Sequence, residues 1–239
     1  MKLKGKVAII TGASSGIGEA IAERFGEEGA TTILCARRTE LLRENTDKIK
    51  SNGGDAYYFQ VDITNDFEVK NMIDSTVNSF GKIDFLINNA GVALGGRIDE
   101  FSMNDFDNMM NLNLRGLYSI TKLVVPIMKQ QRKGAIINIS SGSGLKGSPT
   151  QSAYAASKAG VIKIGESIAE ELKEFNVKVH TVCPGMVAVK NQYANIQKEK
   201  ILQPTDIADT VAYLAKLPER VNIPEVTITP YYPIHMIRK

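Results

Sequence analysis

Tyr154 and Lys158 form the clearest chemical pair in the sequence. They are four positions apart in a stretch that predicts a helix, so their side chains share one helix face. A free tyrosine has a pKa of about 10 and is a poor base near neutral pH. A neighbouring ammonium group favours the phenolate and lowers that pKa. The pair could therefore exchange a proton with a substrate, as carbonyl reduction and alcohol oxidation both require.

A glycine-rich turn follows the first predicted strand, at residues 7–11. It reads Thr-Gly-Ala-Ser-Ser-Gly-Ile-Gly over residues 11–18. Gly12 permits a tight exit from the strand, Gly16 lets the backbone approach a phosphate, and Gly18 lets the next helix pack close to the sheet. The N-terminus of that helix offers free N–H groups and the positive end of its dipole. The turn therefore predicts a site for a pyrophosphate.

The elements that must position these residues alternate between short apolar strands and helices. Strands rich in Val and Ile with few charges are typical of parallel sheets buried on both faces. We therefore expect an α/β fold, a single Rossmann-type doubly wound domain with a central, mostly parallel seven-stranded sheet and helices on both faces. Pro126 should bend or interrupt the long helix at 103–131. Further strands are expected at 31–36, 57–61, 85–88, 135–140, 177–182 and 226–229, and helices at about 19–28, 39–51, 65–80, 103–131, 151–175 and 205–217.

Length and composition are those of an ordinary globular protein. The 239 residues suit one dinucleotide-binding and catalytic domain over 1–239. The net charge of +3 is spread along the chain, so we expect no nucleic-acid partner. Cys35 and Cys183 lie in apolar runs and are expected to be buried, reduced thiols. With no signal peptide and no membrane-length apolar run, the sequence favours a cytoplasmic protein without a membrane partner. No metal site is expected.

Several further motifs occur in an ordered series. Asn-Asn-Ala-Gly occupies 88–91, Tyr-Ala-Ala-Ser-Lys occupies 154–158, Pro-Gly occupies 184–185, and Ser141 precedes Tyr154 by thirteen residues. With the Thr-Gly-x-x-x-Gly-x-Gly turn, this series resembles the classical short-chain dehydrogenase/reductase family from Lys6 to about Leu217. The resemblance implies an oxidoreductase acting on CH–OH donors, which interconverts a carbonyl and a secondary alcohol with a nicotinamide cofactor.

The resemblance also implies roles for four catalytic residues. Tyr154 would be the general acid/base, and Lys158 would also hold the ribose hydroxyls of the cofactor. Ser141 would polarise the substrate oxygen, as a hydrogen-bond donor to developing negative charge. Asn113 would hold a water that connects Lys158 to solvent. Ser140 is the alternative to Ser141, and the thirteen-residue interval favours Ser141.

The choice between NADP and NAD depends on the end of the second strand. An acidic residue there would accept hydrogen bonds from an adenosine 2′-hydroxyl, but the chain has Arg37 and Arg38. Two guanidinium groups suit a 2′-phosphate, so we expect NADP, with NAD less favoured. The alternative is that both arginines are solvated charges at a helix start. The full set of expected cofactor-binding residues is Gly12, Ser14, Ser15, Ile17, Arg37, Arg38, Asp62, Ile63, Asn89, Tyr154, Lys158 and Val187.

The segment after the sixth strand departs from the family pattern. Many relatives have a threonine that contacts the nicotinamide carboxamide where this chain has Val189. The substrate lid, expected at about 188–203, is short and contains Lys190, Gln192, Tyr193 and Asn195. A short polar lid favours a small polar substrate, a hydroxy acid or a ketone.

Other substrates and functions stay open. The C-terminal run from Asn222 lacks the Gly-Gly that ends many acyl-carrier-protein reductases and looks more like relatives that oxidise 3-hydroxy acids and serine-like substrates. A 3-oxoacyl thioester (acyl-carrier-protein) reductase is the main alternative, and a non-catalytic NADP-sensing protein on the same fold is a second. Arg97 and Lys146 could reach an anionic substrate or could be surface charges. The apolar stripes of the helices at 103–131 and 151–175 imply, by the resemblance, a homodimer or homotetramer with an isologous interface.

Overall fold

The computed structural model describes residues 2–189 and 195–237, and its strands form one sheet in the order β3-β2-β1-β4-β5-β6-β7. Every pairing between these strands is parallel. The predicted Rossmann-type, doubly wound fold is thus confirmed, and the described sheet is wholly rather than mostly parallel. The strands are β1 (Val7–Thr11), β2 (Thr31–Ala36), β3 (Asp55–Gln60), β4 (Phe85–Asn88), β5 (Gly134–Ile139), β6 (Val177–Pro184) and β7 (Glu225–Ile228).

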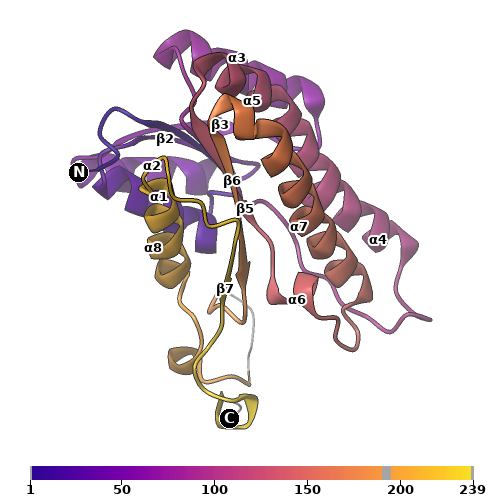
Figure 1. Ribbon diagram of the computed structural model, residues 1–239. Helices are drawn as coiled ribbons and strands as arrows, with labels where there is room; N and C mark the ends of the chain where they lie inside the picture. Colours follow the sequence, from indigo (N-terminus) through magenta and orange to yellow (C-terminus); the bar gives the residue numbers. More distant parts are fainter. Residues whose placement is uncertain (1, 190–194, 238–239) are drawn as a thin grey trace.

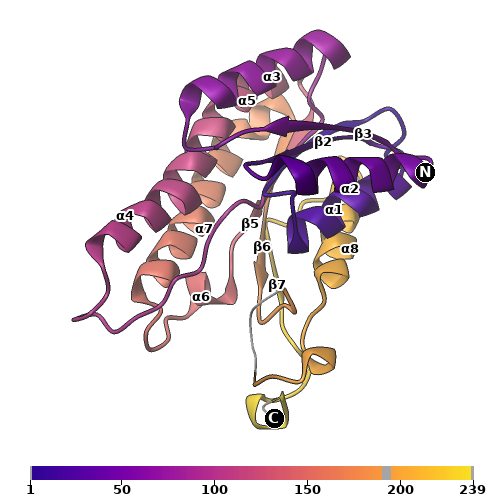
Figure 2. The same ribbon diagram turned by 180° about the vertical axis from the view of Figure 1, so that it is seen from behind.

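Helices cover both faces of the sheet (Figures 1 and 2). One face packs against α1 (Gly16–Glu27), α2 (Thr39–Ser51) and α8 (Pro204–Ala215), through side chains such as Phe25 and Val211. The other face packs against α3 (Asp66–Phe80), α5 (Leu117–Gln131) and α7 (Ser152–Leu172), with Met72, Val124 and Leu172 among the buried contacts. The inner strands β1, β4 and β5 are buried on both sides, as their apolar composition predicts, whereas the edge strands β3 and β7 are only partly buried.

The helix expected at 103–131 is built from three segments. It consists of α4 (Met103–Met110), a π-helical stretch (Asn111–Gly116) and α5. Pro126 lies inside α5, which continues to Gln131, so the helix is not interrupted there. The change in geometry comes earlier, where the helix passes the turn after β3. A Cβ atom on Gly116 would lie 2.9 Å from Ile63 Cδ1, so this tertiary contact is already tight.

Two short helices were not expected from the sequence. Helix α6 (Gly142–Leu145) follows β5 directly, and α9 (Ile234–Ile237) lies near the C-terminus. Ser141 caps α6, because its hydroxyl accepts a hydrogen bond from the Ser143 N–H at 3.1 Å. The start of the first helix also differs by a few residues from expectation. Helix α1 begins at Gly16 rather than near 19, so the glycine turn itself forms the helix N-terminus.

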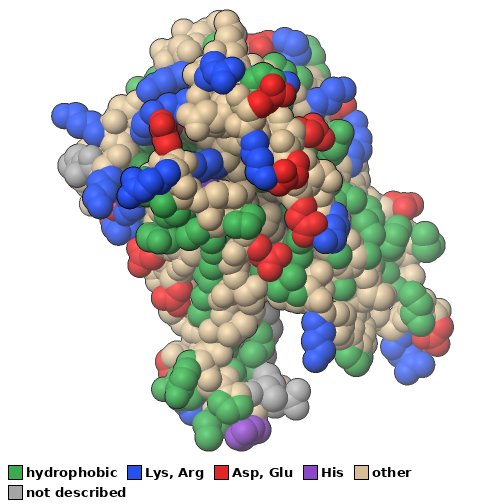
Figure 3. Space-filling view, in the orientation of Figure 1, with side chains coloured by type: hydrophobic (Ala, Val, Ile, Leu, Met, Phe, Trp, Pro, Cys, Tyr) green, Lys and Arg blue, Asp and Glu red, His purple; other side chains and the backbone are tan. Residues whose placement is uncertain are grey.

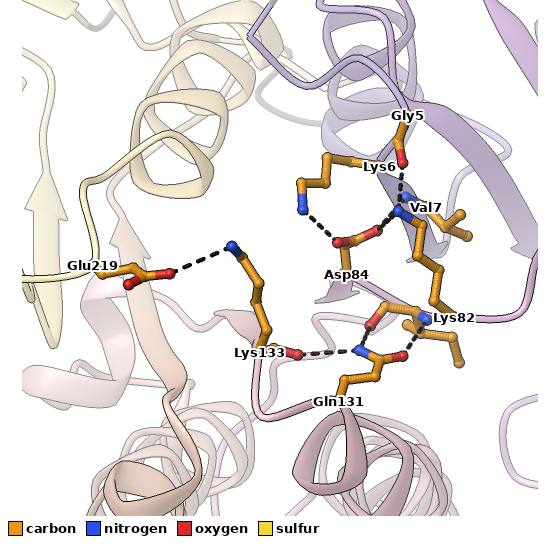
Figure 4. A network of polar contacts seen from close by, with 9 residues as sticks. Gly5, Lys6, Val7, Lys82, Asp84, Gln131, Lys133 and Glu219 are labelled. Carbon is orange, nitrogen blue, oxygen red and sulfur yellow. Dashed lines mark hydrogen bonds and ion pairs between the residues drawn. The ribbon is translucent and has the colours of Figure 1, made fainter.

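A network of ion pairs and hydrogen bonds closes the amino-terminal edge of the sheet, opposite the glycine turn (Figure 4). Buried Asp84, just before β4, accepts hydrogen bonds from Lys6 Nζ at 2.7 Å and from the Val7 N–H at 3.0 Å. Lys82 Nζ lies 3.2 Å from the same carboxylate. The Gln131 side chain pairs with the backbone of Ile83 at 3.0 Å and 2.8 Å. These contacts tie β1, β4 and the end of α5 together at the edge away from the glycine turn.

The carboxyl edge is left open for a ligand. The chain runs outward from β1 through β2 to β3, and then returns to place β4 on the other side of β1. The loops after β1 and β4 therefore separate, and a crevice forms at this switch point. Within residues 2–189 and 195–237, no helix has the length and apolar character to cross a bilayer. Cys35 and Cys183 are both buried and unbridged, as expected.

Candidate active site

A cleft of about 1230 Å³ lies along the carboxyl ends of β1, β4, β5 and β6. Figure 3 shows the molecule notched between its C-terminal extension and the ends of α6 and α7. All of the site residues expected from the sequence line this cleft except Asn113. The expected residues that line it are Gly12, Ser14, Ser15, Ile17, Arg37, Arg38, Asp62, Ile63, Asn89, Ser141, Tyr154, Lys158 and Val187.

The glycine turn has the backbone geometry that its residues predict. Gly12 and Gly16 have φ angles of +66° and +64°, in the left-handed region that favours glycine. A Cβ atom on Gly18 would lie 2.4 Å from the Gly12 carbonyl oxygen, so only glycine allows this close packing. The Gly16 N–H, at the start of α1, donates to the Glu19 carboxylate at 3.2 Å. The turn therefore presents its backbone to the cleft, with the Glu19 carboxylate on the first N–H of α1.

Asn89 joins the turns after β1 and β4. Its Nδ2 donates to the carbonyl oxygens of Thr11 at 2.9 Å and Gly12 at 3.4 Å. Its backbone N–H donates to the Thr11 hydroxyl at 3.0 Å. A second amide, Asn45 on α2, donates from Nδ2 to the Ala13 carbonyl at 3.0 Å. The turn is thus held from both sides before any ligand arrives. Sequence analysis missed Asn45, whose one signal was an amide on the apolar face of α2.

Arg38 provides the positive charge at one end of the cleft. Its Nη2 donates to the hydroxyls of Ser14 at 2.8 Å and Ser15 at 2.7 Å. Arg37 is more exposed, and its Nη1 lies 4.0 Å from the Asp62 carboxylate. Both residues are exposed, and the Arg37 side chain is 68% exposed. Both stand beside the glycine turn and the loop after β3.

Lys158 is the buried cation at the other end of the cleft. Its Nζ donates to the Ile139 carbonyl at 2.9 Å and lies 6.0 Å from the centroid of the Tyr154 ring. Burial lowers the pKa of the Lys158 ammonium from its ordinary value to about 8. The backbone of β5 and the spacing on α7 together fix this cation next to the tyrosine. The arrangement can hold a phenol or phenolate beside a proton-exchanging ammonium.

The structure separates the roles of the two adjacent serines. The Ser140 hydroxyl is buried and donates to the Lys158 backbone carbonyl at 2.8 Å, which anchors α7 to β5. The Ser141 hydroxyl is partly exposed, lines the cleft and accepts from the Ser143 N–H. An accepting hydroxyl keeps its proton available for a ligand. Ser141 is therefore the serine able to donate to a substrate oxygen.

Asn113 stands behind the cleft and does not line it. Its Oδ1 accepts from the Val92 N–H at 2.8 Å, and its Nδ2 donates to the Val92 carbonyl at 2.9 Å and to Ser157 Oγ at 3.1 Å. A Cβ atom on Gly91 would lie 3.0 Å from Asn113 Oδ1 and 3.4 Å from Lys158 Nζ. Asn113 is therefore near Lys158, and its contacts hold the loop after β4 in place. The π-helical stretch is the element that carries this side chain.

Val189, which stands where many relatives have threonine, supports the glycine turn. A Cβ atom on Gly16 would lie 3.2 Å from Val189 Cγ1. Of the expected lid, Lys190, Gln192 and Tyr193 lie outside the described residues. Lining residues that sequence analysis did not name include Leu112, Gln151 and Met186. They come from three separate loops or helices, and no local pattern marks them.

Comparisons with known proteins agree with this geometry. The family model described as short chain dehydrogenase matches residues 6–200. The chain is 35% identical over 230 residues to the 3-oxoacyl-[acyl-carrier-protein] reductase FabG of Thermotoga maritima, covering 90% of this chain and 92% of that protein. A metagenomic short-chain oxidoreductase solved in complex with NADP superposes with a TM-score of 0.87 and 35% identity, over 97% of this chain and all of that one.

Serine dehydrogenase from Escherichia coli is a further similar structure, with a TM-score of 0.85 and 32% identity over 94% of this chain and 97% of that one. The matches extend across strands, glycine turn and the tyrosine–lysine helix alike. The chain is an oxidoreductase and belongs to the short-chain dehydrogenase family.

Proposed function

We propose that the protein interconverts a carbonyl and a secondary alcohol with NADP(H), using Tyr154 as the general acid/base. The observation that carries the proposal is the buried Lys158 ammonium, held by the Ile139 carbonyl 6.0 Å from the Tyr154 ring centroid. An ammonium in that position is costly to bury. Its use is to stabilise the phenolate form of Tyr154.

The residues of the cleft fit a dinucleotide. The close approach at Gly18 and the N-terminus of α1 suit a pyrophosphate, and Arg38 with Ser14 and Ser15 suits a 2′-phosphate. Asp62 and Ile63 would contact the adenine, while Lys158 would hold the ribose hydroxyls near Tyr154. A bound nicotinamide supplies or accepts the hydride, so the protein itself must provide the proton and the orientation.

Three side chains would handle the substrate oxygen. In reduction, Tyr154 donates its phenolic proton to that oxygen, and in oxidation the phenolate removes a proton from the alcohol. Ser141 donates a hydrogen bond to the oxygen and stabilises the charge that develops on it. Lys158 keeps the phenolate stable, and Asn113 holds the loop beside Lys158 in position.

NADP is proposed over NAD because both arginines stand at the adenosine end without an acidic residue in the place that would bind a 2′-hydroxyl. The NADP complex of the metagenomic relative supports this choice. A small polar substrate, a hydroxy acid or ketone, is proposed because of the short lid and the similarity to serine dehydrogenase. A 3-oxoacyl thioester is the second candidate, favoured by the similarity to the Thermotoga reductase.

The test is oxidation of NADPH and NADH, followed by absorbance, against small oxo acids, ketones and a 3-oxoacyl thioester. Tyr154→Phe should lower kcat by about 10²- to 10⁴-fold while NADPH binding is retained. Tyr118→Phe is the matched control, because Tyr118 is an exposed tyrosine on α5 outside the cleft. Undiminished turnover in Tyr154→Phe would contradict the mechanism. Tight NADPH binding with no turnover on any carbonyl would favour the sensing protein instead.

A further inference from the structure

The charged side chains of the cleft are divided between its two ends. The carboxylates that line it, Glu19, Glu44 and Asp62, come from α1, α2 and the loop after β3. These elements surround the end where Arg37 and Arg38 lie. Among the described lining residues, the end around Ser141 and Tyr154 contains no carboxylate. The charged side chains at this end are Lys158, which has a role in the proposed mechanism, and Lys146, which has none.

Lys146 is placed on the same small element as Ser141. Helix α6 has four residues, with Ser141 as its N-cap and Lys146 as its C-cap. Four residues of helix rise only about 6 Å, so a lysine side chain can extend back along α6. The Lys146 N–H donates to the Gly142 carbonyl at 3.1 Å, which fixes where the side chain begins. The backbone of Lys146 is thereby fixed relative to Ser141, and its exposed side chain lines the cleft.

The Lys146 ammonium has no carboxylate partner within the part of the chain that the structure describes. The other candidate cation, Arg97, pairs with Asp99 at 3.3 Å and Glu100 at 3.7 Å and does not line the cleft. Of the two cations that could reach an anionic substrate, only Lys146 is therefore positioned and available for one.

The cleft also has an apolar part to its lining. This part includes Val92, Ala93, Leu112 and Met186, with the Gln151 amide as a polar group. The Gln151 amide lies close to Gly95, where an added Cβ atom would be 2.6 Å from Gln151 Nε2. The end of a cleft that is lined by one sign of charge concentrates ions of the opposite sign.

We infer that Lys146 binds a carboxylate on the substrate, and that the substrate class is short oxo acids and their hydroxy acids. The inference rests on the proposed function, because it takes the Ser141–Tyr154 end as the place where the carbonyl binds. The carboxylate would pair with Lys146 Nζ while the carbonyl oxygen lies against Ser141 and Tyr154. Lys146 is thus a specificity-determining residue and takes no part in the proton transfer.

The test compares each oxo acid with its own methyl ester, because esterification removes the charge and keeps the carbonyl. The probes are acetoacetate with methyl acetoacetate, and 4-oxopentanoate with its methyl ester, with NADPH as reductant. For one of the two acids, kcat/KM should exceed that of the ester by about ten-fold or more. Lys146→Met should remove this preference by raising KM for the acid while leaving the ester unchanged, and Lys146→Arg should restore most of it. Arg97→Met is the matched control and should preserve the preference.

Binding measurements separate this inference from the proposed function. Titration calorimetry of the complex with NADP⁺ should detect butyrate binding to the wild-type protein and at least ten-fold weaker binding to Lys146→Met, whether or not turnover occurs. If the esters are turned over as fast as the acids, and Lys146→Met affects both equally, the inference about Lys146 is overturned. The proposed carbonyl–alcohol reaction is then still supported. A preference for acetoacetyl thioester over acetoacetate would also overturn the inference about Lys146. If butyrate binding depends on Lys146 but no carbonyl compound is turned over, the proposed reaction is overturned and the carboxylate site is retained.

Discussion

Arg38 binds the Ser14 hydroxyl through two nitrogens, with Nε at 3.2 Å and Nη2 at 2.8 Å. Its Nη2 also donates to Ser15 at 2.7 Å, so one guanidinium joins the end of β2 to the glycine turn. A guanidinium held in this way is pre-oriented, and little side-chain freedom remains to be lost when an anion binds. The positive charge of Arg38 is therefore held at the two serines, although the turn itself has no basic residue.

Arg38→Ala should weaken NADPH binding much more than NADH binding. The two cofactors differ by the 2′-phosphate, and a hydrogen bond to a charged group contributes about 1.5–3 kcal/mol. The dissociation constant for NADPH should therefore rise about 10- to 100-fold, with that for NADH within about three-fold of the wild type. Fluorescence titration of each reduced cofactor measures this directly. Arg43→Ala, an exposed position on α2 outside the cleft, is the control. Equal weakening of both cofactors would show that Arg38 only maintains the turn.

The buried Lys158 predicts a pH-dependent rate. Its pKa is lowered by burial to about 8, so the side chain is positive below that pH and becomes neutral above it. Stabilisation of the Tyr154 phenolate by the ammonium should therefore be present below about pH 8 and decline as the pH rises through that value. We expect an ionisation near pH 8 in kcat/KM. Lys158→Arg should move it upward beyond the measurable range, because guanidinium stays protonated.

Profiles of kcat/KM from pH 6 to 10 test this expectation, with Lys163→Arg on the exposed side of α7 as the control. The same ionisation near pH 8 in the Lys158→Arg variant would assign it to another group. The measurement must be paired with NADPH binding at each pH, since Lys158 is also expected to hold the ribose.

The regular part of the fold was predictable because it depends on local patterns. Apolar runs rich in Val and Ile gave all seven strands within a few residues, and the alternation with helices gave the parallel order. Helix α6 was missed because Gly-Ser-Gly-Leu has low helix propensity and forms only where Ser141 caps it. The π-helical stretch, in which Gly116 packs closely against Ile63, was missed because apolar periodicity does not separate it from the α-helix around it.

The site was predictable where one motif carries one role. Tyr154, Lys158 and the glycine turn follow from spacing, and the resemblance supplied Ser141 and Asn113. The Arg38 contacts with Ser14 and Ser15 join residues 24 and 23 positions apart through side chains, and such pairs cannot be read from separate segments. The distinction between Arg97 and Lys146 likewise needed the positions of Asp99 and Glu100.

Asn113→Ala should reduce both stability and activity. The substitution leaves the Val92 N–H and carbonyl without the side chain that pairs with them at 2.8 Å and 2.9 Å. Loss of a buried hydrogen-bond partner costs about 1–3 kcal/mol, so the free energy of unfolding should fall by that amount. We expect kcat to fall about ten-fold or more, because the loop beside Lys158 loses its anchor. Denaturant titration and steady-state rates measure the two effects, with exposed Asn108→Ala on α4 as the control. Wild-type stability with reduced kcat would favour the water-holding role alone.

Asp84→Ala should destabilise the protein without affecting the cleft, since it lies at the opposite edge of the sheet (Figure 4). Asp84 is 6% exposed and accepts from both Lys6 Nζ and the backbone N–H of Val7. Removing the carboxylate leaves that buried N–H unpaired and two lysines without their partner, at a cost of about 2–4 kcal/mol. Glu219→Gln is the comparison, because it removes an ion pair between exposed side chains: Glu219 is 69% exposed and Lys133 is 59% exposed. Its loss should lower the free energy of unfolding by at most about 0.5 kcal/mol. Urea unfolding of both variants, with kcat/KM measured below the transition, would separate the two. Equal stability of the two variants would mean that Asp84 does not hold β1 to β4.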